Sequence, residues 1–257
     1  MATMISRQIL TQSTPMIPPS IRHQKSLFSS KSFAASRESI RKVRFSEKPR
    51  GLSLVAMASS TATVSVPEDI GEVLGEVSIF TAAGEIVKFN DLWDQQEGVA
   101  VVALLRHFGC FCCWELASAL KEVKEKFESA GVKLIAVGVG TPDKARLLAE
   151  RLPFPLDSLY ADPERKAYDV LGLYYGLRRT FLNPASVKVF SRREAVKKAM
   201  KNYTIKATPD DTSSVLQQGG MFVFKGKQLL YARKDEGTGD HAPLDEIFDI
   251  CCKVPAS

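Results

Sequence analysis

An uninterrupted apolar run from Val99 to Leu105 constrains the fold more than any other feature of the sequence. Because the run has no polar side, it predicts a strand that is covered on both faces, as the central strands of parallel sheets are. It is also the longest apolar run of the chain, and at seven residues it is far shorter than the roughly 20 residues of a membrane span. The run therefore indicates an α/β sheet protein without a membrane span.

The flanking segments alternate between strand and helix patterns. The predicted elements before and after the run are a hairpin at 76–80 and 85–89, a short helix holding Trp93, a helix that ends at Gly131, a strand at 132–139, a helix from Pro142, a short strand at 157–161, a helix opened by Asp162-Pro163-Glu164, a hairpin at 221–224 and 228–232, and a helix from Pro243. This order is that of the thioredoxin fold, a central mixed sheet flanked by helices. We expect one such domain over 73–252, with a linker at 58–72 and a partly helical, cationic insertion at 172–218.

The first 57 residues differ in charge from the rest of the chain. They hold 10 Lys and Arg against only Glu38 and Glu47, a formal charge of +8, whereas residues 58–257 hold 25 basic and 27 acidic residues, a charge of −2. A serine-rich, basic and acid-poor leader without a long apolar core predicts a chloroplast transit peptide, cleaved near residues 55–58, and a stromal location. Because the basic charge belongs to the leader, nucleic acid is not the expected partner.

A Cys-x-x-Cys pair follows the apolar run at the start of the next helix. Cys110 and Cys113 lie one helical turn apart, where unpaired backbone N–H groups and the helix dipole favour a thiolate. The dipole contributes only about 0.3–1 kcal/mol at an exposed site, so Arg106 or His107 is needed as a further source of positive charge. Strand alternation predicts that only one of these two side chains faces the thiols. The pattern predicts redox chemistry.

The remaining cysteines leave alternatives open. A metal site would use Cys110, Cys113, Cys251 and Cys252, although adjacent cysteines such as the last two rarely bind one ion together. Cys251 lies on the apolar face of the last predicted helix and is interpreted as a core residue. Cys112 is interpreted as a tolerated small residue more readily than as a spare thiol for exchange.

Two polar features near the C-terminus also have more than one interpretation. His241 precedes the last helix, where it acts either as a loop residue that caps local backbone or as a base near the thiols. The basic stretch from Arg192 to Lys201 is interpreted as a solvated helix face, with an anionic docking surface as the alternative.

Four sequence blocks resemble the peroxiredoxin-like two group of AhpC/TSA antioxidant-enzyme proteins in the thioredoxin superfamily. The blocks are Arg106-His107-Phe108-Gly109-Cys110-Phe111-Cys112-Cys113, Tyr160-Ala161-Asp162-Pro163-Glu164-Arg165, Gln218-Gly219-Gly220-Met221-Phe222-Val223 and Gly239-Asp240-His241. The resemblance implies a thioredoxin-like fold and thiol-based reduction at Cys110 and Cys113, with Arg106, His107, Gly220 and His241 as supporting residues. Some members of that group reduce peroxide-type substrates. With its leader, the chain is similar to the plastid members of the group.

The chain also departs from the better known relatives. Peroxiredoxins carry a Pro-x-x-x-Thr-x-x-Cys loop, in which Cys110 here occupies the threonine position, and thioredoxins place a proline where this chain has Gly219-Gly220. Alignment with peroxiredoxins would make Cys113 the attacking thiol. In thioredoxins the nucleophile stands at the exposed start of the helix, which corresponds to Cys110, and we slightly prefer this assignment.

We therefore expect a thiol oxidoreductase that needs no cofactor. Its expected substrate is a small peroxide or disulfide, and its expected partner is an external reductant of the thioredoxin, glutaredoxin or glutathione type. The alternative from another class is a non-catalytic binding or redox-sensing module that uses residues 172–218 as its partner surface.

Overall fold

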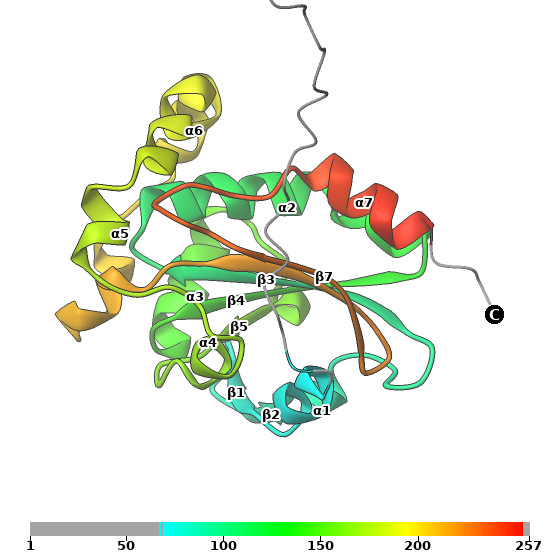
Figure 1. Cartoon of the computed structure of the whole chain (residues 1–257). Coiled ribbons are helices and arrows are strands. Elements are labelled where there is room, and N and C mark those ends of the chain that lie inside the picture. Colours follow the sequence, from blue (N-terminus) through cyan, green and yellow to red (C-terminus); the bar gives the residue numbers. More distant parts are fainter. Residues whose placement is uncertain (1–66, 68, 254–257) are drawn as a thin grey trace, which may run out of the picture. The chain divides into compact units, whose positions relative to one another are not determined.

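The computed structural model describes residue 67 and residues 69–253 (Figure 1). The predicted transit peptide and its cleavage site lie outside these residues, as does most of the predicted linker. The strands are β1 (Ser78–Thr81), β2 (Ile86–Lys88), β3 (Val99–His107), β4 (Val132–Val139), β5 (Leu159–Ala161), β6 (Gly220–Lys225) and β7 (Gln228–Lys234). They form one mixed sheet in the order β2-β1-β5-β4-β3-β6-β7. This confirms the predicted α/β, thioredoxin-like class, including its leading hairpin.

β3 is the predicted central strand and is paired on both sides. It runs parallel to β4 and antiparallel to β6. The parallel pair is joined by α2 (Phe111–Ser129), so the start of α2 lies at the end of β3. The motif Cys110-Phe111-Cys112-Cys113 therefore occupies the strand-to-helix junction that the sequence predicts.

Apolar side chains of β3 alternate between two cores, one on each face of the sheet. Val101 and Ala103 contribute to the core under α2, α3 (Pro142–Arg151) and α7 (Leu244–Cys252). Val102 and Leu104 contribute to the opposite core, which is covered by α1 (Ile70–Gly75) and α4 (Lys166–Val170). In Figure 1, α2 and α7 lie above the sheet and α1 lies below it. Burial on both faces is why the sequence of this strand lacks a polar side.

Three local details differ from the predictions. The segment before β3 forms a 3-10 turn, Phe89–Asp91, which ends before Trp93; the indole instead donates a hydrogen bond to the Gly226 carbonyl oxygen at 2.9 Å. Asp162 does not start α4 directly, because the helix begins at Lys166 after Arg165 in a left-handed conformation.

The Asp162 carboxylate still caps α4 by accepting hydrogen bonds from two backbone N–H groups of its first turn. At the N-terminal end of the domain, α1 begins within the predicted linker 58–72 and buries Ile70 and Leu74 in the core. The folded part thus starts before residue 73.

The insertion at 172–218 is partly helical, as predicted. It contains α5 (Leu177–Phe181), the 3-10 turns η3 (Pro184–Arg192), η4 (Ile205–Ala207) and η5 (Thr212–Leu216), and α6 (Arg193–Met200). Figure 1 shows α5 and α6 at one end of the sheet, beside the start of α2. No described helix is long and apolar enough to cross a membrane.

Candidate thiol site

The thiol site is built at the junction between β3 and α2. Cys110 is the N-cap residue of α2, with an extended backbone, and its side chain is buried with only 3% of the residue exposed. Gly109 precedes it because a Cβ there would come 2.0 Å from Thr208 Oγ1 of the insertion. The Tyr203 hydroxyl donates a hydrogen bond to the Gly109 carbonyl oxygen at 2.8 Å. The insertion therefore closes over the loop that carries Cys110.

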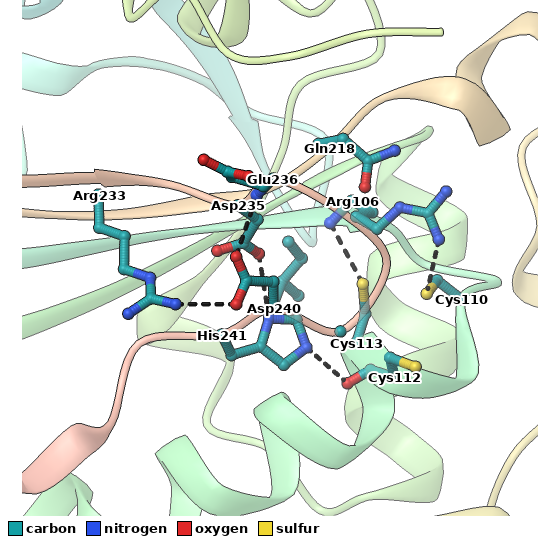
Figure 2. A network of polar contacts seen from close by, with 12 residues as sticks. Arg106, Cys110, Cys112, Cys113, Gln218, Arg233, Asp235, Glu236, Asp240 and His241 are labelled. Carbon is teal, nitrogen blue, oxygen red and sulfur yellow. Dashed lines mark hydrogen bonds and ion pairs between the residues drawn. The ribbon is translucent and has the colours of Figure 1, made fainter. Parts of the chain in front are cut away.

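Arg106 is the charged partner of Cys110 (Figure 2). Its Nη1 lies 3.3 Å from Cys110 Sγ, while Nε and Nη2 donate to the Gln217 and Val215 carbonyl oxygens at 3.0 and 2.6 Å. The residue is 4% exposed, and none of these hydrogen-bond partners in the described chain is a carboxylate. A buried guanidinium needs a compensating anion. A thiolate at Cys110 supplies one.

The three neighbouring thiols compete for ionisation, and Cys110 is favoured. Hydrogen bonds from the Cys112 and Cys113 thiols, together with the charge of Arg106, hold the pKa of Cys110 well below that of an ordinary thiol despite burial. Burial and the adjacent Cys110 raise the pKa of Cys113, and its Sγ accepts the Arg106 backbone N–H at 3.2 Å. The hydrogen bond to Cys110 is the main reason that the pKa of Cys112 is also raised. Of the two thiols left open by the sequence, Cys110 is therefore the one that ionises more readily.

Cys112 and Cys251 differ in how they relate to this site. Cys112 is fully buried and its thiol is hydrogen-bonded to Cys110, a contact that the sequence did not indicate. Cys251 lies in the core under α7, where burial raises its pKa to about 11, as expected of a core thiol. Cys252 is exposed, and all five cysteines are free. Among the described residues, no group of three or more His, Cys, Asp or Glu side chains is arranged to hold a metal ion.

Neither the His107 imidazole nor Gly220 makes a hydrogen bond to a thiol of the site in the described chain. His107 is buried, its Nδ1 has no hydrogen-bond partner in the described chain, and burial lowers its pKa to about 4, so it is neutral. Arg106 is thus the cation beside Cys110. Gly220 pairs with Leu104 in the sheet, and a Cβ there would come 2.7 Å from the Arg233 carbonyl oxygen. Its role is close packing of β6.

His241 lies beside the start of α2, where it links the last loop to the thiol motif. Its Nδ1 is 3.1 Å from Asp235 Oδ2, and its Nε2 donates to the Cys112 carbonyl oxygen at 3.2 Å (Figure 2). The side chains of His241 and Asp235 are nearly inaccessible, at 6% and 3% exposed. The Cys112 carbonyl oxygen can only accept, so Nε2 carries a proton, and the Asp235 carboxyl group beside Nδ1 favours the charged form of the imidazole by raising its pKa. His241 thus lies beside the thiol motif with both ring nitrogens bonded, one of them to a backbone carbonyl oxygen as the capping interpretation predicts, and a role as a base near the thiols stays a prediction.

We expect His241 to make stability depend on pH. Burial opposes its charge, but the hydrogen bond and the charge of Asp235 outweigh that effect and raise the pKa of His241. The resulting stabilisation is complete below the unfolded pKa of about 6.5 and is lost as pH rises through the folded pKa, with about 1.4 kcal/mol lost for each pH unit that separates the two values. Urea unfolding of wild type and His241→Gln at several pH values from about 6 to 9 measures this loss. A wild-type curve parallel to that of His241→Gln would contradict the assignment.

A second polar link holds the insertion against α2, and little in the sequence indicates it. Arg192 Nε and Nη2 lie 2.8 and 3.1 Å from the two carboxylate oxygens of Glu115, and Nη2 also donates to the Gly239 carbonyl oxygen at 2.7 Å. The only signal is that Glu115 is a charged residue between the apolar residues Trp114 and Leu116 near the start of α2. Asp235 had no signal at all, because its role depends on where the loop to His241 passes.

Comparisons with known proteins relate the chain to a family. The family described as AhpC/TSA antioxidant enzyme matches residues 119–237. Thioredoxin-like protein AAED1, chloroplastic, of Arabidopsis thaliana is 32% identical over 200 residues, 77% of this chain and 79% of that protein. Prostamide/prostaglandin F synthase of Bos taurus is 31% identical over 184 residues, 70% of this chain and 86% of that protein.

Among solved structures, peroxidoxin BcpB from Mycobacterium tuberculosis aligns with a TM-score of 0.49 at 13% identity, covering 70% of this chain and 94% of that chain. The family match and the identity to the Arabidopsis relative over most of both chains establish the relationship. The chain belongs to the AhpC/TSA antioxidant-enzyme family of thioredoxin-like proteins.

Proposed function

We propose that this protein is a thiol oxidoreductase that reduces a small peroxide or disulfide with Cys110 as nucleophile and Cys113 as resolving thiol. The observation that carries the proposal is the buried guanidinium of Arg106, whose Nη1 lies 3.3 Å from Cys110 Sγ and stabilises the thiolate there. Membership of an antioxidant-enzyme family supports thiol-dependent redox chemistry in general. Our proposal adds to this the use of the C-x-x-C pair and the class of substrate.

For a hydroperoxide, the Cys110 thiolate attacks the terminal oxygen and breaks the O–O bond. The departing alkoxide takes up a proton and leaves as an alcohol, while Cys110 becomes a sulfenic acid. The Cys113 thiol then attacks the Cys110 sulfur, which forms a disulfide and releases water. An external dithiol, or two molecules of glutathione, returns both cysteines to thiols and is itself oxidised to a disulfide. No step requires a cofactor.

The neighbouring groups fit the separate steps of this sequence. Burial keeps Cys113 protonated while Cys110 is ionised, so the two thiols begin in the states that attack and resolution require. The chloroplastic location of the Arabidopsis relative supports a plastid compartment, where thioredoxin-type or glutaredoxin-type reductants are the partners that we propose.

Replacing Cys113 by serine should stop the cycle after its first half. We expect one equivalent of peroxide to give a Cys110–Cys113 disulfide in the wild type, but a sulfenic acid at Cys110 in Cys113→Ser, because the resolving thiol is absent. Dimedone labelling and peptide mass spectrometry identify both products. Cys252→Ser, which changes an exposed thiol, is the matched control. A wild-type disulfide that excludes Cys113 would overturn the proposed resolving role.

A further inference from the structure

The insertion at 172–218 carries a charge opposite to that of the domain around it. It contains nine Lys and Arg residues against three Asp and Glu residues, a formal charge of +6. The other residues of 58–257 contain 16 basic and 24 acidic residues, a charge of −8. Because α5 and α6 lie together at one end of the sheet (Figure 1), the positive charge is gathered there. Such a separation of charge orients a protein toward an anionic surface.

Most of the cations in this segment are not used in the fold. Arg192 is bound to Glu115, Lys198 to Glu122, and Arg179 lies 3.8 Å from Glu236. Within the described part of the chain, five other exposed cations make no ion pair or hydrogen bond through their side chains: Arg178, Arg193, Lys197, Lys201 and Lys206. These side chains are available to a partner.

Large apolar side chains alternate with these cations and are exposed. The five most exposed in the insertion are 61–77% accessible: Leu177, Phe181, Leu182, Val187 and Ile205. A hollow of about 470 Å³ lies beside Phe181, and its lining also includes Val189, Val196, Arg193 and Lys197. Phe111, the residue after Cys110, lines the same hollow. The apolar patch therefore extends to the beginning of α2.

We propose that the insertion docks on the surface of an anionic lipid bilayer. In this arrangement the exposed apolar side chains enter the boundary between head groups and acyl chains, while the flanking cations remain at the head-group level. The charge is complementary to anionic head groups, and the individually exposed Leu, Phe and Ile side chains favour a lipid boundary over the more polar surface of an acidic protein. This inference goes beyond the thiol chemistry and does not depend on it.

The test is co-sedimentation of residues 60–257 with vesicles. This part contains all seven strands and both cores, and it omits the leader, whose charge of +8 would itself bind anionic lipid. We expect binding to vesicles of equal parts phosphatidylcholine and phosphatidylglycerol, weakening as salt is raised, and little binding to phosphatidylcholine alone. Replacing Arg178, Arg193 and Lys197 together by glutamine should weaken binding about a hundredfold, at about fivefold for each cation.

Two further variants decide whether the insertion is the surface involved. Phe181→Ser combined with Leu182→Ser should also reduce binding, whereas the control Ile86→Ser, Leu156→Ser and Lys253→Gln, which changes exposed residues elsewhere, should not. Far-UV circular dichroism establishes that each variant is folded. Equal binding to neutral and anionic vesicles, or an equal loss in the control, would overturn the proposal. Absence of binding to both vesicles would also overturn it, and an acidic protein would then be the partner class to examine.

Discussion

Cys110→Ser is expected to reduce turnover of peroxide or disulfide substrates to the uncatalysed rate. A serine hydroxyl is not ionised at pH 7, so the Arg106 guanidinium would no longer face a nucleophilic anion. The change removes one buried sulfur and keeps the side-chain shape, so we expect the sheet and both cores to persist. Substrate consumption coupled to an external dithiol, followed in parallel with thermal unfolding, separates loss of chemistry from loss of fold.

Cys252→Ser is the matched control for this experiment, since Cys252 is exposed on α7 and lies outside the thiol site. It should retain wild-type turnover. If Cys110→Ser retained substantial turnover while Cys113→Ser lost it, the attacking thiol would be Cys113, as the peroxiredoxin alignment suggests, and our assignment of the two thiols would be wrong.

Arg106→Met should slow the reaction of Cys110 at pH 7 by roughly 10- to 100-fold. The substitution removes a charge-assisted hydrogen bond to the thiolate, and such bonds contribute about 1.5–3 kcal/mol. The pKa of Cys110 should rise, so the rate should recover as the solution is made alkaline and the thiol ionises again. Stopped-flow alkylation of Cys110 as a function of pH measures both effects.

Thermal unfolding of the variant separates loss of the cation from loss of the fold. Arg106 also donates to the Gln217 and Val215 carbonyl oxygens, so its loss is expected to loosen the insertion. A misfolded variant would lack the wild-type unfolding transition and its Cys110 would alkylate as a free thiol with a midpoint of about 8.5, whereas a folded site without its cation would keep the transition. Arg178→Gln, which removes an exposed cation without an ion pair in the described chain, is the control. An unchanged pH profile in Arg106→Met would show that the guanidinium does not stabilise the thiolate.

The elements around the site could be predicted from the sequence because their patterns are local. The two-sided apolar run of β3 indicates burial on both faces, and the Cys-x-x-Cys pair falls between that run and a segment of helical period. The proline that opens α3 and the closing hairpin around Gly226 are equally local signals, and the structure confirms both. These features follow from backbone preference and from side-chain period alone.

The partners of the thiols could not be predicted because they come from segments distant in the sequence. Alternation along the strand could not choose between Arg106 and His107, because β3 is covered on both faces and both residues are buried; only the structure shows the Arg106 guanidinium bonded to Cys110. The choice of Arg106 depends on the Gln217 and Val215 carbonyl oxygens, about 110 positions later. Asp235 likewise becomes a partner of His241 only because the last loop brings the imidazole next to the Cys112 carbonyl oxygen.

The most direct test of the account is the pH dependence of alkylation of each cysteine in the reduced wild-type protein. Iodoacetamide pulses from pH 4 to pH 10, located by peptide mass spectrometry, give the ionisation midpoint of Cys110 separately from those of Cys112 and Cys113. We predict that Cys110 reacts first among the three, with a midpoint well below the value of about 8.5 for a free thiol. A midpoint at or above about 8.5, or earlier ionisation of Cys113, would contradict the central claim that the neighbouring thiols and Arg106 together hold Cys110 as the thiolate.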